Sequence, residues 1–252
     1  SRELGWRLFL RDLRAQYRQS FLGLIWAFLP PIVMAAGFTF AKNARVFHIG
    51  LTDIPYPAYV MLSMTLWQTF IEALNCPVKA VASSIGYLGK VNFPRESIII
   101  AKLCEVFFNF LIKLILIVII FTWFKIQSTW SIAVAPFALI VLIMMGLSIG
   151  LLIAPLGALF HDLNRALTIF TGFWLFLTPV VYPLPQSGLF KTIVILNPVT
   201  PLLVTTRELA TTGVVSMPVT FLIVSVFAAM ALLLAWVVYR LAMPYVIERF
   251  GG

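Results

Sequence analysis

Hydrophobic residues fall in six long runs along the chain, and short polar links separate these runs. The runs cover roughly residues 22–42, 57–80, 98–123, 132–159, 166–183 and 217–243. A bilayer-spanning helix needs about 20 mostly apolar residues, whereas the strands of a membrane barrel alternate over roughly 10 residues. The pattern therefore predicts an all-α integral membrane protein with six transmembrane helices.

The composition supports this fold class and sets the orientation. Of the 252 residues, 62% are hydrophobic and 11% are charged, whereas soluble domains carry about 25% charged residues. Eleven of the 18 lysines and arginines lie on the side of the predicted bundle that holds both termini. The positive-inside rule therefore predicts that both termini are cytoplasmic. The net charge of +9 then reflects topology and contact with anionic lipid rather than nucleic-acid binding.

Residues 3–19 are predicted to form an amphipathic helix on the cytoplasmic membrane surface. Apolar and aromatic side chains recur at helical spacing, and arginines form a second stripe beside them, as in helices that lie in the interface. The two stripes include Trp6, Arg7, Arg11, Arg14, Tyr17 and Arg18. Two interpretations stay open: a plain membrane anchor, or a helix that also contacts a cytoplasmic partner.

The link at residues 81–97 is too polar to span a bilayer and too apolar for a loose loop. Its glycines Gly86 and Gly89, followed by Phe93 and Pro94, predict a short helix and a turn that press against another surface. One interpretation is a simple interfacial turn. The other is a rigid segment that transmits motion from a cytoplasmic partner.

The segment at residues 183–213 is rich in proline and contains an apolar run, Leu189–Leu196, that is too short to cross the bilayer. Asn197 is a suitable N-cap, Pro198 or Pro201 a suitable first helical residue, and Gly213 a suitable helix stop. We expect two short half-helices that dip into the outer leaflet. Irregular backbone at membrane depth has to be buried in protein or line a cavity, so this segment is predicted to belong to a gate.

Polar side chains form one stripe on the second run and one on the third. The stripes comprise Gln68, Glu72, Asn75 and Lys79, and Lys102, Glu105, Asn109 and Lys113. Ionisable groups within a membrane need partners or water, so we expect the stripes to face each other or water. A structural ion-pair network is favoured over an ion relay, for which the sequence gives no further support.

Small residues recur every four positions in the fourth run, at Gly146, Gly150, Ala154 and Ala158. This spacing lets helix backbones approach closely. The residues from Gly146 to Gly150 also match the G-x-S-x-G pattern of serine hydrolases, but that pattern requires a strand-to-helix turn. An intramembrane protease is therefore rejected.

Aromatic residues make up 14% of the chain and gather in the first and fifth runs. Two interpretations stay open: rings that face lipid and the membrane interface, or a pore lined with flat rings on which sugars stack. The candidate lining residues are Trp26, Phe28, Phe38, Phe170, Phe173, Trp174 and Tyr182.

Four landmarks in the sequence resemble those of one transporter family. They are Tyr17–Trp26 followed by Pro30, Asn92–Glu96, Thr178–Pro183, and Leu196–Pro198 followed by Pro201. Their order and spacing resemble the membrane subunit of polysaccharide-exporting ABC transporters of the ABC-2 type along nearly the whole chain. The O-antigen exporter permeases (Wzm-type) are the most similar, with teichoic-acid and capsule exporters close behind.

The resemblance implies a single domain over residues 1–252 in the bacterial inner membrane, with an interface helix at 1–20 and a six-span core at 22–243. It implies a homodimer docked on two cytoplasmic ATPase subunits (Wzt-type), with lipid-linked polysaccharide passing between the two permease subunits. ATP and Mg would be bound by the partner, and this chain would hold no cofactor and no metal. The first and fifth spans would line the channel.

Site residues follow from the same resemblance. The outer gate would include Asn197, Pro198 and Pro201. The family usually has Arg-Asp where this chain has His161-Asp162, which leaves the role of residue 161 open. Coupling to the ATPase would involve Ser84, Gly86, Tyr87, Lys90, Arg95 and Asp162.

Other functions are weighed against the exporter. The chain contains no G-x-x-x-x-G-K-[ST] phosphate loop, so it cannot bind ATP by that route and needs a partner for power. An ABC-2 exporter of drugs or small lipids is the alternative, and a passive channel is a weaker one. A membrane-embedded transferase is disfavoured, because the nine carboxylates lie mostly at the ends of the spans.

Overall fold

The computed structural model describes residues 25–44, 50–88, 95–127, 129–160 and 162–251. The predicted interface helix and its six site residues lie outside these ranges. Every regular element within them is helical. The elements are α2 (Ile25–Asn43), α3 (Tyr56–Leu88), α4 (Arg95–Trp123), the 3-10 turn η1 (Trp130–Ala133), α5 (Ala135–Leu159), α6 (Asp162–Leu177), α7 (Leu189–Leu196), α8 (Val199–Ala210) and α9 (Pro218–Gly251).

Each of the six predicted runs corresponds to one of these helices, namely α2, α3, α4, α5, α6 and α9. By length and apolar composition, three described segments can each cross a bilayer: Ile98–Trp123, Ala135–Leu159 and Pro218–Val246. A fourth is added if α7 and α8 count as one broken span. The all-helical membrane class is confirmed, while the number of six spans stays a prediction.

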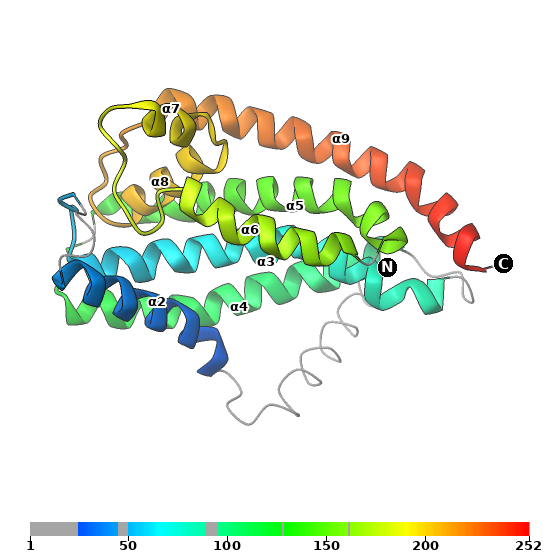
Figure 1. Cartoon of the computed structure of the whole chain (residues 1–252), viewed down its shortest axis with the longest axis horizontal. Helices are drawn as coiled ribbons and strands as arrows, with labels where there is room; N and C mark the ends of the chain where they lie inside the picture. Colours follow the sequence, from blue (N-terminus) through cyan, green and yellow to red (C-terminus); the bar gives the residue numbers. More distant parts are fainter. Residues whose placement is uncertain (1–24, 45–49, 89–94, 128, 161, 252) are drawn as a thin grey trace.

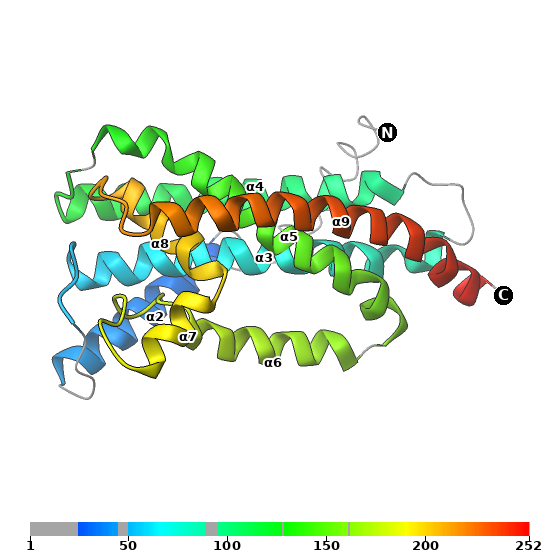
Figure 2. The ribbon, with the colours of Figure 1, turned by 90° about the horizontal axis from the view of Figure 1, so that it is seen from above.

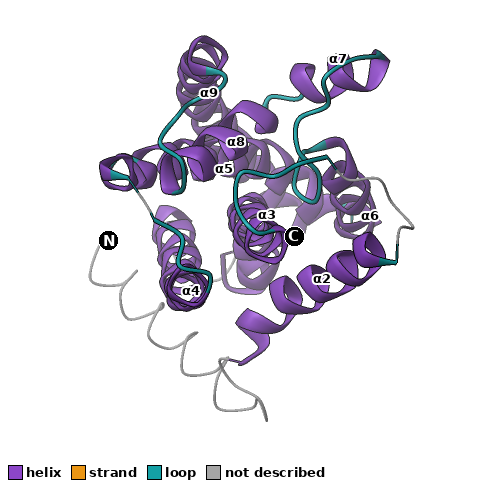
Figure 3. Ribbon diagram, turned by 90° about the vertical axis from the view of Figure 1, so that its left-hand side faces the viewer, coloured by secondary structure: helices purple, strands orange, loops and turns teal. Residues whose placement is uncertain are grey.

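Helix α3 lies at the centre of the bundle. Seen end-on, it is surrounded by α2, α4, α5 and α6, and α9 lies on the far side of α5 (Figure 3). The long helices run side by side, with α7 and α8 gathered at one end (Figure 1). The core follows α3 from Tyr56 to Val81, where most apolar side chains are buried.

Helices α3 and α5 approach each other closely because α5 places glycines at the contact. A Cβ on Gly146 would lie 2.7 Å from the carbonyl oxygen of Phe70, and one on Gly150 would overlap that of Leu74. Ala154 continues the same row and is fully buried. The close approach predicted from the four-residue spacing of small residues is confirmed.

Helix α6 ends at Leu177, six residues before the predicted end of the fifth span. Pro179 explains the early end, because a proline disfavours helical backbone at the residue before it and lacks an N–H. The next backbone groups bond elsewhere: the carbonyl oxygens of Val181 and Tyr182 accept hydrogen bonds from hydroxyl groups of α3. The predicted boundary at residue 183 is therefore wrong.

The link at residues 81–97 also differs from its prediction. Helix α3 continues without interruption from Tyr56 to Leu88, so residues 81–88 form its last two turns rather than a separate short helix. Because this stretch contains no proline after Pro77, nothing in its backbone chemistry ends the helix earlier. Arg95 begins α4, and residues 89–94 lie outside the described part of the chain.

Candidate functional site

The bend between α7 and α8 forms a corner at one end of the bundle, where the two helix axes differ by 84°. The side chain of Asn197 occupies this corner. Its amide nitrogen donates hydrogen bonds to Thr178 Oγ1 at 2.8 Å and to the Leu177 carbonyl oxygen at 3.3 Å. Its amide oxygen accepts from Trp174 Nε1 and from the Val199 backbone N–H, both at 3.1 Å. Asn197 therefore joins the end of α6 to the start of α8.

This arrangement refines the predicted role of the corner residues. Asn197 satisfies the first backbone N–H of α8, as an N-cap side chain would, although it lies one residue before the helix boundary at Pro198. Pro201 is the third residue of α8 and is buried. Gly213 follows α8 with a left-handed φ of 78°, and its N–H donates to the Glu208 carbonyl oxygen, so its role as the helix stop is confirmed.

Arg207 of α8 is a buried charged residue at this end of the bundle. Only 6% of it is exposed. Its guanidinium donates hydrogen bonds of 3.0 Å to Ser63 Oγ and to the Pro179 carbonyl oxygen. The same group lies 4.2 Å from the ring centroid of Tyr59, and the Tyr59 hydroxyl donates to the Tyr182 carbonyl oxygen at 2.8 Å. Arg207 thus binds α8 to α3 and to the segment after α6.

This network was not predicted from the sequence, which did not single out Arg207, Tyr59 or Ser63. One signal was available: an arginine in a short apolar helix at membrane depth needs a partner. The partners themselves could not be read from the sequence, because Ser63 lies 144 positions away.

The aromatic side chains of α6 divide into two sets. Phe170, Phe173 and Phe176 are 59%, 69% and 54% exposed and form an outward stripe along the helix. Trp174 instead turns into the subunit, where its ring meets Phe70 edge-on at 5.5 Å. Within the stripe, the ring of Phe170 also packs against Trp174, with the ring centroids 5.4 Å apart. Helix α6 lies at the margin of the bundle (Figure 2).

A cavity of about 700 Å³ lies where α2, α7 and the segment after α6 meet. Phe38, Phe176, Tyr182 and Phe190 are among the residues that line it. The structure thus brings together two of the predicted lining residues, Phe38 and Tyr182. Phe28 is half-buried on α2, and the side chain of Trp26 lies outside the described atoms.

The two predicted polar stripes meet at one ion pair. Lys113 Nζ of α4 donates to Glu72 Oε1 of α3 at 2.5 Å, with 2% of the lysine side chain and 31% of the glutamate side chain exposed. Lys102 and Glu105 pair at 2.9 Å within α4. The expectation that the stripes face each other is confirmed for Glu72 and Lys113. Asn75 and Asn109 are half-buried on the same two helices.

The described helix ends that carry predicted coupling residues lie at the opposite end of the bundle from α7 and α8. The end of α3, the start of α4, the start of α6 and the end of α9 all lie there (Figures 1 and 2). Asp162 is exposed in the first turn of α6. Ser84, Gly86 and Tyr87 belong to the last turns of α3, and Lys90 lies outside the described residues. Their contact with an ATPase stays a prediction.

Comparison with known proteins places the chain in a family. The sequence profile of the ABC-2 type transporter family matches residues 3–210. The O-antigen export system permease protein RfbA of Myxococcus xanthus is 26% identical over 69% of this chain and 66% of its own length. The polysialic acid transport protein KpsM of Escherichia coli is 23% identical over 92% of this chain and 91% of its own. A Klebsiella pneumoniae RfbA is 22% identical over 81% of this chain and 78% of its own.

The family match covers most of the described helices, including α6, α7 and α8. Together with the apolar helices, it makes the chain a multi-pass membrane protein. The chain belongs to the ABC-2 type transporter family.

Proposed function

We propose that the chain is the permease subunit of an ABC transporter that exports lipid-linked polysaccharide across the bacterial inner membrane. The observation that carries this proposal is the outward aromatic stripe of α6, Phe170, Phe173 and Phe176, in a chain whose relatives are named for O-antigen and polysialic acid export. Flat rings offer apolar faces to the C–H surfaces of sugars while their edges stay polarised. An exposed row of rings therefore suits a polymer that slides past it.

The channel in this proposal forms between two copies of the chain, each with six spans and cytoplasmic termini. Helices α2 and α6 line it, and α7 with α8 form the outer gate. Support comes from the exposure of Phe173 and from the cavity of about 700 Å³ beside Phe38 and Tyr182. The networks of Asn197 and Arg207 hold the gate helices to the bundle, so the gate would move together with the segment after α6.

Power comes from two Wzt-type ATPase subunits at the cytoplasmic end, where ATP and Mg are bound by the partner. The coupling surface combines the end of α3, including Ser84, Gly86 and Tyr87, with Lys90, Arg95 and Asp162. Because α3 is one continuous helix from this surface to Tyr56, with Pro77 inside it, a displacement there would be transmitted along the helix toward the outer end. ATP-driven closure would then shift the subunit between two packings.

The test is reconstitution of the full chain with a candidate ATPase in proteoliposomes, with ATP hydrolysis measured with and without lipid-linked polysaccharide. We expect the polymer to stimulate hydrolysis. Tyr87→Ala should abolish the stimulation, whereas Tyr245→Ala, at an exposed tyrosine near the same end, should not. Phe173→Ala should reduce the stimulation more than Phe227→Ala, which removes an exposed ring from α9.

Two other outcomes would contradict the proposed exporter. A stable complex that ignores the polymer but responds to small lipids or drugs would replace the polysaccharide exporter with the alternative ABC-2 exporter. Failure of every candidate ATPase to associate would contradict the powered mechanism and favour a passive channel.

A further inference from the structure

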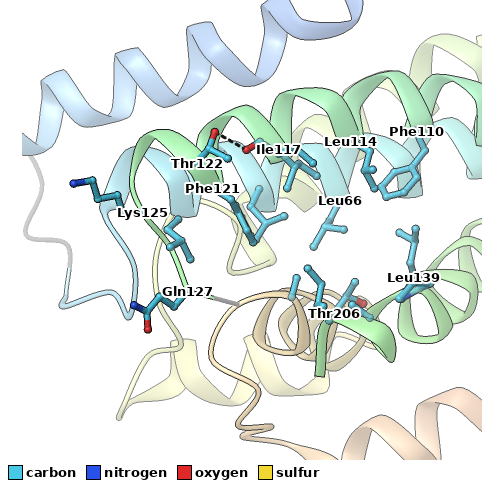
Figure 4. Close-up of a pocket in the computed structure, with 17 residues that line it drawn as sticks. Leu66, Phe110, Leu114, Ile117, Phe121, Thr122, Lys125, Gln127, Leu139 and Thr206 are labelled. Carbon is cyan, nitrogen blue, oxygen red and sulfur yellow. Dashed lines mark hydrogen bonds between the residues drawn. The ribbon is translucent and has the colours of Figure 1, made fainter. Parts of the chain in front are cut away.

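A second cavity, of about 650 Å³, opens between α3, α4, α5 and α8, away from the proposed channel helices α2 and α6. Its walls are apolar and include Leu66, Phe110, Leu114 and Leu139 (Figure 4). Its volume lies within the range of about 300–1,000 Å³ that is typical of small-molecule sites. Leu114 and Val118 of α4 are exposed on this wall, so an apolar chain in the bilayer can reach the cavity sideways.

A smaller, more polar pocket adjoins the cavity at the end of the bundle. Lys125, Ile126 and Gln127 line the apolar cavity and also a pocket of about 270 Å³. Asp53 lines that smaller pocket from the segment before α3. Figure 4 shows Lys125 and Gln127 at the loop end of the cavity, and Phe110 and Leu139 at the opposite end. The composite site is therefore apolar at one end and carries one cation and one carboxylate at the other.

The backbone at Lys125 adopts a conformation that is unusual for a lysine. Its φ is 51°, the left-handed conformation, which among the described residues no other non-glycine side chain adopts. The Ile126 N–H donates to the Phe121 carbonyl oxygen and the Lys125 N–H to that of Thr122. This is the Schellman ending of a helix, in which Lys125 occupies the position that glycine usually takes. Non-glycine residues in sparsely populated backbone conformations occur often at ligand sites.

The loop that carries Lys125 has the character of a membrane interface. Trp123, just before it, is 81% exposed, and Trp130, just after it, is 93% exposed. Exposed tryptophans are enriched at the level of the lipid headgroups. In the described part of the chain, no carboxylate forms an ion pair with the Lys125 ammonium, which leaves it available to a ligand.

We propose that the composite pocket binds a zwitterionic phospholipid with a primary amine, phosphatidylethanolamine. One acyl chain occupies the apolar cavity, the phosphate accepts charge-assisted hydrogen bonds from Lys125, and the ammonium donates to Asp53. A phosphatidylglycerol headgroup offers nothing cationic to Asp53, and the quaternary amine of phosphatidylcholine has no N–H to donate. Because Thr206 and Ala210 of α8 line the same cavity, the bound lipid lies against the back of that helix. The inference does not depend on the exported substrate.

The test is native mass spectrometry of the purified full chain after exposure to equal amounts of the three phospholipids with identical acyl chains. We expect phosphatidylethanolamine to be retained in about five-fold excess over the other two, the effect of one favourable charge contact at the membrane surface. Asp53→Asn should remove this preference. Lys125→Asn should lower retention of all three, and asparagine tolerates the left-handed backbone.

Two further variants complete the experiment. Lys191→Gln, at an exposed lysine of α7, should leave lipid retention unchanged, while Leu114→Trp should fill the cavity and lower retention of every lipid. Helix content by circular dichroism checks that each variant folds. The lipid preference of the unaltered chain is measured separately and does not depend on any variant. Equal retention of the three lipids, a preference for phosphatidylglycerol, or an equal effect of Lys191→Gln and Lys125→Asn would overturn the proposal.

Discussion

The ion pair between Glu72 and Lys113 makes an asymmetric prediction about stability. Lys113 is 2% exposed and Glu72 is its hydrogen-bond acceptor, whereas 31% of the Glu72 side chain is exposed. Glu72→Met removes the acceptor and leaves a buried ammonium without a partner. Breaking a buried pair in this way costs about 3–5 kcal/mol. At about 2–4 °C per kcal/mol for a chain of this size, the unfolding midpoint should fall by about 6–20 °C.

The opposite single change should cost less. Lys113→Met leaves Glu72, whose side chain is 31% exposed and therefore less desolvated than that of the lysine, so the expected loss is about 1–3 kcal/mol. The double variant Glu72→Met with Lys113→Met leaves no buried charge at all. Replacing a buried pair with apolar residues of similar volume is often neutral or stabilising. We therefore expect the double variant to be more stable than Glu72→Met alone.

The assay is thermal unfolding of the full chain in one detergent, followed by circular dichroism for the three variants and the unaltered chain. A double-mutant cycle then gives the coupling energy between the two residues. The reasoning is refuted if the double variant unfolds at the same temperature as Glu72→Met, because the buried charge would then not be the cause. It is also refuted if Lys113→Met is the more damaging single change.

Two further predictions concern the close approach of α3 and α5 and the buried Arg207, and the same unfolding assay measures both. Gly150→Ala should lower the free energy of unfolding by about 1–3 kcal/mol, because the new Cβ would overlap the Leu74 carbonyl oxygen. The control Gly172→Ala places its Cβ in open space and should be neutral or slightly stabilising. Equal effects of the two variants would contradict the close approach. Arg207→Met should lower the free energy of unfolding by about 2–5 kcal/mol, since it leaves buried acceptors unpaired and removes the charge from the ring of Tyr59. A loss below about 1 kcal/mol would show that the network is dispensable.

Much of the helix arrangement could be predicted from the sequence because apolar length and small-residue spacing are local properties. The runs that became α4, α5 and α9 were placed within a few residues at their starts, and Gly146 and Gly150 pointed to the contact that the structure shows. The end of α6 was misplaced although Pro179 was visible. The apolar residues after it continued the hydrophobic run, and that run was given more weight than the proline.

The contacts that organise the end of the bundle around α7 and α8 could not be predicted in the same way. Arg207, Tyr59 and Ser63 come from separate parts of the chain, and only folding brings their polar atoms together. Asn197 was chosen as a helix cap from its sequence position, but its bonds to Thr178 and Trp174 depend on where α6 ends. Local sequence rules indicate which residues need partners, and the topology of the bundle decides which partners they obtain.

The glycine contact between α3 and α5 fixes the spacing of these two helices. Backbone in van der Waals contact cannot slide or rotate without breaking the interlock at Gly146 and Gly150, so these two helices form a fixed frame. Helix α6 contacts that frame through Trp174, whose ring packs against Phe70 of α3, while the outward rings of α6 stay largely exposed. A displacement of α3 during a transport cycle would therefore carry α5 with it, so that the spacing between these two helices stays constant.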